Sequence, residues 1–288
     1  MSNRKIAVVT DSTAYIPAQA LGDLDIPIIP LWLIWGDERL RDGVDIDPPA
    51  FYRRLREAKT LPTTSQPSAG EFVDFYRRVA AESGADTIVG AYISSGISGT
   101  VASAEAAKVQ VPELDITIID SFFTSMGLGF IVLAAARVAA AGGSLEEVIA
   151  AAEGTRDRMN ILFAVDTLEY LHRGGRIGGG KRFLGTALKI KPLLHLEDGR
   201  IEALAQVRTK RKAIAQMLDI VEERLGGRQM AEASILDADS PKEAEAVAEQ
   251  VKERFGISTV YCAMVSPVIG THVGPGTIGI TFYPAAPA

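Results

Sequence analysis

The stretch that decides the fold is TIVGAYISSGISGT, residues 87–100. Its first seven residues are mostly apolar, which predicts a short buried strand. The next seven are rich in hydroxyls and glycines, which are typical of a loop, and the pattern from about Val101 predicts a helix. A strand, a polar loop and a helix therefore follow one another directly.

The same order occurs at two other places before residue 142. Residues 5–10 predict a strand that ends in Asp11-Ser12-Thr13, and residues 116–119 predict a strand that ends in Asp120-Ser121 before a long apolar helix. Repeated strand–loop–helix units indicate a parallel sheet with helices on both faces. Ligands of such sheets bind beyond the carboxyl ends of the strands, so these loops are candidate ligand loops. Thr63-Thr64-Ser65-Gln66, in a polar loop over residues 61–70, is a further candidate.

The second half of the chain has a different pattern. The sequence predicts a strand over residues 161–165, a helix from residue 167, and a hairpin that turns at Glu197-Asp198-Gly199-Arg200. It then predicts helices over residues 210–225 and 241–255, with strands near residues 233–236, 259–264 and 277–283. The predicted fold is α/β with two α/β domains. Residues 1–155 form an N-terminal parallel sheet flanked by helices, and residues 156–288 form a C-terminal mixed-sheet α/β domain.

Composition limits the class of protein. The 288 residues carry a net charge of −6, which disfavours non-specific nucleic-acid binding because that binding depends on basic residues. The single cysteine, Cys262, cannot form an internal disulfide and fits a reducing compartment. We expect no secretory signal at the N-terminus. Residues 122–141 have the length of a membrane span, but Arg137 and several polar residues interrupt them, so we predict a buried helix and no stable membrane insertion. These features favour a cytoplasmic protein.

Positive charge is concentrated in one segment. Between His172 and Lys212 there are eleven Lys and Arg residues and three Asp and Glu residues, so the segment carries +8. One interpretation is an ordinary solvated face. The other is a docking surface for an acidic partner or a phosphoryl group.

The candidate loops are rich in hydroxyls but poor in groups that do chemistry. The three histidines lack zinc-ligand spacing, and the sequence has no phosphate-binding glycine motif and no nucleophile elbow. Each loop has a structural alternative, because Ser and Thr cap helices and His272 is also compatible with an exposed loop. Taken together, hydroxyls, helix-start N–H groups and one imidazole suit a small anion such as a carboxylate.

Several sequence blocks resemble the DegV family of bacterial fatty-acid-binding proteins. In chain order these blocks are KIAVVTDST, PTTSQPSAGEF, SSGISGT, LHRGGRI, LKIKPLL with EDGRI, VRTKRKAI and GTHVGPGTIGI. The resemblance extends from about Lys5 to Ile280. It implies two α/β domains, a long-chain fatty acid in a tunnel, and no cofactor. It also implies a partner, the ATP-dependent catalytic subunit of fatty acid kinase, which converts the bound acid to an acyl phosphate for phospholipid synthesis.

The resemblance also assigns roles to individual residues. It implies that Thr63, Ser95 and His272 contact the fatty-acid carboxyl group, and that Thr64 and Ser65 share this role. It implies that Arg176 and Arg208 serve kinase docking or phosphoryl transfer, and it leaves Arg173 without a role. The sequence does not place the apolar residues that shape the tunnel, among them Phe122, Phe123, Met126, Leu128, Ile131 and Leu188.

Two other classes of function stay open at this point. One is a serine-dependent hydrolase of a lipid-like ester, with Ser95 as nucleophile, His272 as base, and Asp11 or Asp120 as the orienting acid. The other is a small-molecule sensor or structural interaction protein, which the absence of lipid from the purified protein would favour.

Overall fold

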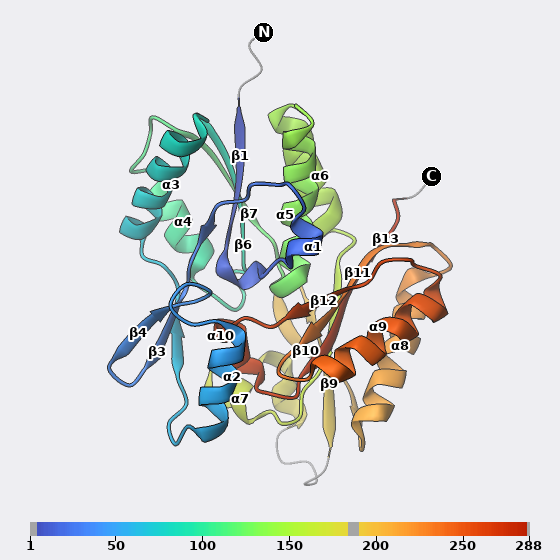
Figure 1. The fold of residues 1–288 in the computed structure, drawn as a ribbon. Coiled ribbons are helices and arrows are strands. Elements are labelled where there is room, and N and C mark those ends of the chain that lie inside the picture. The colour runs from blue at the N-terminus through green and yellow to red at the C-terminus, as the bar shows by residue number, and fades with distance from the viewer. Residues whose placement is uncertain (1–4, 184–189, 287–288) are drawn as a thin grey trace.

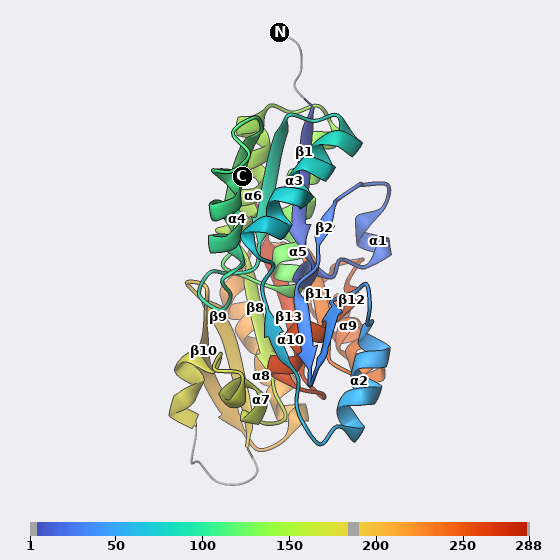
Figure 2. The same ribbon diagram turned by 90° about the vertical axis from the view of Figure 1, so that its left-hand side faces the viewer.

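The structure, a computed structural model, describes residues 5–183 and 190–286. It confirms the predicted α/β class, with a parallel sheet flanked by helices and a mixed sheet in the second half. Figures 1 and 2 show the two large sheets one above the other, with the N-terminal sheet at the top of both views. Leu188 lies outside the described residues.

The upper sheet has four parallel strands in the order β2-β1-β6-β7. Their bounds are β1 Ile6–Asp11, β2 Ile28–Ile29, β6 Thr87–Tyr92 and β7 Asp115–Asp120. Strand β6 is buried along its whole length, as expected for a central parallel strand covered on both faces.

Helices cover both faces of this sheet, α3 and α4 on one side and α5 and α6 on the other (Figure 1). Their bounds are α3 Ala69–Ser83, α4 Thr100–Lys108, α5 Ser125–Ala140 and α6 Leu145–Arg156. Ser68 and Ser144 start α3 and α6 with reciprocal capping boxes, which satisfy backbone N–H groups that a helix start leaves free.

Helix α5 is the apolar segment that the sequence predicted to be buried, and this prediction is confirmed. Met126, Leu128 and Ile131 are fully enclosed. Within residues 5–183 and 190–286, no helix is long and apolar enough to cross a bilayer.

A small antiparallel sheet, β4-β3-β5, lies beside the lower half of the molecule and contacts helix α10. Its strands are β3 Trp32–Trp35, β4 Glu38–Arg41 and β5 Thr63–Ser65. The prediction of a loop over residues 61–70 is therefore wrong for Thr63–Ser65, which pair with β3, and for Ala69 and Gly70, which begin α3. A three-residue polar strand has no alternating apolar pattern of its own to reveal it. Helix α2, Pro48–Glu57, follows β4, and the Asp47 side chain caps its start by accepting a hydrogen bond from the Ala50 N–H.

The lower sheet has six strands in the mixed order β10-β9-β8-β13-β11-β12. Their bounds are β8 Asn160–Ala164, β9 Lys191–Glu197, β10 Arg200–Val207, β11 Met230–Asp237, β12 Tyr261–Met264 and β13 Ile278–Pro284. The predicted hairpin between β9 and β10 is confirmed. Asp198 and Gly199 both have positive φ, which is the backbone of the tight type I′ turn that an Asp-Gly pair favours.

The two faces of the lower sheet have different neighbours. Helices α8, Lys210–Leu225, and α9, Pro241–Phe255, pack on one face. The other face turns toward α5 and joins a large apolar core that runs from Val8 to Tyr283. The proposed boundary near residue 155 thus separates the two large sheets, although they share one core. The remaining elements are η1 Ser12–Ala14, α1 Ala18–Leu21, α7 Glu169–Arg173, η2 Gly178–Phe183 and α10 Pro267–Val273.

Candidate functional site

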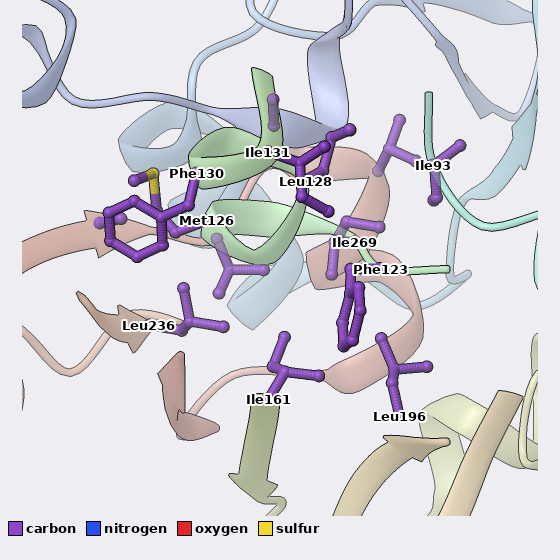
Figure 3. Packing of buried hydrophobic residues seen from close by; sticks show 14 of the residues in the cluster. Ile93, Phe123, Met126, Leu128, Phe130, Ile131, Ile161, Leu196, Leu236 and Ile269 are labelled. Carbon is purple, nitrogen blue, oxygen red and sulfur yellow. The ribbon is translucent and has the colours of Figure 1, made fainter. Parts of the chain in front are cut away.

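A buried cavity lies between the two large sheets, where the upper loops meet the inner face of the lower sheet. It contains about 830 Å³ of empty space, including its opening to solvent. Figure 3 shows Ile161, Leu196 and Leu236 pointing from the lower sheet toward Phe123 and the residues of α5.

Most of the cavity wall is aliphatic. The apolar lining residues are Leu31, Ile93, Ile97, Ile161, Phe163, Leu171, Leu196, Ile201, Leu236, Val265, Val268, Ile269 and Val273. They come from both halves of the chain, so neither half makes the cavity alone. A wall of this kind binds hydrocarbon by removing it from water.

Polar groups gather where β5 meets α10. The Thr64 hydroxyl and the His272 Nε2 are 2.8 Å apart and hydrogen-bonded. Both residues line the cavity, together with Ser65 and Gln66. Thr64 reaches this place because β5 pairs with β3, and His272 because it lies in the last turn of α10.

His272 is largely enclosed, not on an exposed loop. Burial, with a smaller contribution from the nearby Arg176 guanidinium, lowers the pKa of its imidazole to about 4. The ring is therefore uncharged at neutral pH. Its Nδ1 is buried without a hydrogen-bond partner in the described part of the chain, and Gly174 lies so close to it that a Cβ there would be 2.2 Å away. An uncharged, confined imidazole suits hydrogen bonding better than proton transfer.

Arg176 lies in the cavity wall. Its Nε donates to the Ile97 carbonyl at 3.2 Å, and its Nη1 donates to the Gly174 carbonyl at 2.7 Å. These bonds tie the glycine-rich segment after α7 to the loop after β6. The candidate ligand loops contain no basic residue. The fold brings the Arg176 guanidinium into the cavity wall from a segment that is distant in the sequence. A guanidinium at this position favours an anionic ligand group.

The structure brings together some of the candidate residues and separates others. Thr64, Ser65, His272 and Arg176 line the cavity. Thr63, Ser95 and Arg208 are exposed and are not among its lining residues. The Ser95 N–H donates to the Asp120 carboxylate at 3.2 Å, which holds this loop together.

Sequence reasoning missed three hydroxyl residues of the lining, Ser98, Thr124 and Ser125. Ser98 belongs to the same SSGISGT motif as Ser95, and the sequence does not determine which of the two serines lines the cavity. The Thr124 Oγ1 is buried and has no hydrogen-bond partner in the described part of the chain. A buried polar atom without a partner is costly, so a ligand group at this point would be stabilising.

Comparisons with known proteins cover nearly the whole chain. A family model described as an uncharacterised protein of the DegV family matches residues 5–285. A DegV domain-containing protein of Streptomyces coelicolor is 41% identical over 279 residues, which is 96% of this chain and 98% of that protein.

Two solved structures are similar in both sequence and fold. One is described as fatty acid binding of a DegV family protein from Thermus thermophilus. It is 36% identical, has a TM-score of 0.90, and the match covers 98% of this chain and 100% of that one. The other is DegV, a fatty acid binding protein from Bacillus subtilis. It is 35% identical, has a TM-score of 0.89, and the match covers the same shares of the two chains.

Proposed function

Because the chain belongs to the DegV family, we propose that it binds one long-chain fatty acid in the cavity and presents the carboxyl group to a separate ATP-dependent kinase. The observation that carries the proposal is the Thr64–His272 pair at the polar end of a mostly aliphatic cavity. Similar proteins of Thermus thermophilus and Bacillus subtilis are described as fatty acid binding, which supports the same ligand class here.

The hydrocarbon tail supplies the binding energy in this proposal. Each buried methylene contributes about 0.8 kcal/mol, so a tail of about 15 methylenes contributes roughly 12 kcal/mol before the costs of association. The aliphatic walls offer no hydrogen bonds to a ligand of another kind. Tail burial therefore sets the affinity, and the polar end sets the orientation.

The carboxylate lies at the Thr64–His272 pair. A buried carboxylate needs partners, because desolvation without them costs several kcal/mol. Thr64 and His272 offer hydrogen bonds, Ser65 and Ser98 are further hydroxyls of the lining, and Arg176 offers a compensating charge. We therefore assign the carboxyl contacts to the residues that line the cavity and give Ser98 the place that the resemblance gave to Ser95.

The geometry favours a carrier over the serine-dependent hydrolase. The His272 Nε2 bonds to Thr64, and its Nδ1 has no orienting carboxylate within the described residues. The Asp11 carboxylate accepts bonds from Thr13 and from the Ile93 N–H, and Asp120 holds the loop at Ser95. The hydrogen bond of His272 thus goes to Thr64, and the four candidate residues Ser95, His272, Asp11 and Asp120 do not form a relay.

The kinase part of the proposal rests on charge. Arg208 is exposed in the basic segment 172–212 and does not line the cavity. Lys189, also in this segment, lies outside the described residues. An exposed basic surface can steer an acidic partner without affecting the ligand. We also propose that the protein is cytoplasmic and that the kinase is a separate protein that docks on it.

The Thr64→Val variant tests the ligand site. Valine keeps the shape of threonine but removes the hydroxyl, so the carboxylate and the imidazole both lose a partner. We expect hexadecanoic acid to bind the delipidated variant on the order of tenfold more weakly than the wild type, as measured by calorimetric titration. Thr281→Val is the matched control, because Thr281 Oγ1 is buried on β13 without a partner among the described residues.

Equal affinity of Thr64→Val and Thr281→Val would refute the carboxyl assignment. Absence of fatty acid binding by the wild type would refute the function itself. The same preparations give a second readout when a fatty acid kinase catalytic subunit and ATP are added. Arg208→Gln should then slow acyl phosphate formation while leaving the affinity for hexadecanoic acid unchanged.

A further inference from the structure

A second cavity lies on the outer side of the Thr64–His272 pair. Thr64, Arg176 and His272 line both cavities, so they form the wall between them. The remaining residues that line the outer cavity are Lys59, Thr60, Leu61, Pro62, Thr63, Tyr170, Arg173, Gly174 and Thr271. The aliphatic residues of the inner cavity give way here to hydroxyls and basic side chains.

The outer cavity is built for negative charge. Lys59, Arg173 and Arg176 line it, and no Asp or Glu is among its described lining residues. Arg173 pairs with Glu169 at 2.8 Å, but both side chains are more than half exposed. Such a surface pair contributes at most about 1 kcal/mol, so a dianion can compete with Glu169 for the guanidinium.

We propose that this outer cavity binds the phosphoryl group of the acyl phosphate, with Lys59 and Arg173 as its anion-binding residues. The inference rests on the proposed function, and it gives a role to Arg173. The outer cavity binds the phosphoryl group of the product, whereas the Thr64–His272 pair binds the carboxyl group of the fatty acid.

The chemistry places the added group on this side of the wall. A carboxylate oxygen of the fatty acid attacks the γ-phosphorus of a nucleoside triphosphate held by the kinase. The new bond joins that oxygen to phosphorus, the bond from phosphorus to the β,γ-bridging oxygen breaks, and nucleoside diphosphate leaves. The phosphoryl group thus extends beyond the carboxyl end, away from the hydrocarbon tail, and the cavity on that side carries the two further cations.

A stable analogue separates binding of the product from binding of the fatty acid. Hexadecylphosphonic acid has the same kind of tail as hexadecanoic acid and a head group that carries up to two negative charges. We expect the Lys59→Gln/Arg173→Gln variant to lose affinity for the phosphonate by about tenfold or more, and affinity for hexadecanoic acid by less than about threefold. Calorimetric titration of the delipidated protein measures both.

The matched control is Arg78→Gln/Lys242→Gln. Arg78 forms an exposed i,i+4 pair with Glu82, as Arg173 does with Glu169, and Lys242 is an exposed lysine on another helix. The control removes the same charge from other surfaces, so its affinity for both ligands should stay within about twofold of the wild type. For the wild type alone, added salt should weaken phosphonate binding more steeply than hexadecanoate binding.

The outcomes distinguish failure of the phosphoryl site from failure of fatty acid binding. Phosphonate binding that is unchanged in the Lys59/Arg173 variant, or weakened equally in the control, would overturn the inference while fatty acid binding stands. If the wild type bound neither ligand, the proposed function would fail and the inference with it. Melting temperatures show whether the variants are folded. If they are not, equal salt dependence of the two ligands in the wild type overturns the inference.

Discussion

At the scale of single residues, Asp42 links the two halves of the molecule. Its carboxylate accepts a hydrogen bond from the Ser12 hydroxyl at 2.8 Å, and it lies near Ser266 and Val268 at the start of α10. Burial raises the pKa of this carboxyl group to about 7. The folded protein therefore holds a proton on Asp42 over a pH range in which the unfolded chain has released it.

This proton gives a pH dependence with a definite sign. As the pH rises from 5 to 8, the unfolded chain binds fewer protons at Asp42 than the folded protein, so the free energy of unfolding falls by roughly 3 kcal/mol through this group. We expect Asp42→Asn to remove this loss. Urea unfolding of the delipidated proteins should show the difference in stability, variant minus wild type, rising by about that amount over this range.

The imidazole of His272 changes the free energy of unfolding with pH in the opposite direction. The pKa of its imidazole is lowered to about 4, so protonation of the unfolded chain below pH 6.5 reduces stability. His272→Asn should therefore flatten the acid side of the profile. A difference profile for Asp42→Asn that falls with pH, or stays flat, would contradict the burial that we describe for this carboxyl group.

The identity of the residues that line the cavity was only partly predictable from the sequence. The motifs around Thr64, Ser98 and His272 all reach the cavity, but only Ser98 lies in a loop at the carboxyl end of a parallel strand, whereas Thr64 lies in β5 and His272 in α10. The sequence did not distinguish Ser98 from Ser95, since that choice depends on how the loop turns. Arg176 is remote in sequence from these motifs, and only tertiary packing brings it into the same wall.

At the scale of elements, the turn between β9 and β10 joins the lower sheet to the loops of the upper sheet. The Ser94 hydroxyl donates to the Gly199 carbonyl at 2.7 Å, so this turn is bonded to the loop after β6. Gly199 has φ +76°, and a Cβ there would lie 2.5 Å from the Ser94 Oγ. Glycine is thus required both by the turn and by the contact between the two halves.

The Gly199→Ala variant tests this contact. We expect it to lower the free energy of unfolding by about 1–3 kcal/mol and to speed dissociation of bound fatty acid, measured by stopped-flow release. Gly227→Ala is the control, because Gly227 has φ +80° but a Cβ there would enter open space, with nothing within 4 Å. Equal effects of the two variants would show that only backbone strain matters and that the contact does not.

Long helices with strong signals were predictable, whereas the short elements β5 and α10 were not. The bounds of α8 and α9 match the predicted residues, since both have sustained helical periodicity and α9 also has a proline at its start. Helix α10 was not predicted, because its seven residues include Gly270 and several β-branched residues, which disfavour helix. Packing accounts for Gly270, where a Cβ would lie 2.5 Å from the Tyr52 hydroxyl.

At the scale of the whole molecule, the fold followed from repeated local patterns, whereas the cavity did not. The strand–loop–helix units and the Asp-Gly turn are local signals, and each agrees with the final topology. The cavity depends on how the upper loops lie over the lower sheet, and its wall joins residues as far apart as Leu31 and Thr277. No local pattern encodes such a contact.

The central claim is that the tail of a fatty acid lies among the aliphatic residues between the two sheets, with its carboxyl group at Thr64 and His272. A crystal structure with a long-chain fatty acid brominated at its tail end tests this directly, because anomalous scattering locates the bromine. We expect one bromine peak among the apolar residues that line the inner cavity, such as Ile161, Leu196 and Leu236, and carboxyl density within hydrogen-bonding distance of Thr64. Bromine on the protein surface, or the carboxyl group at the aliphatic end, would contradict the account.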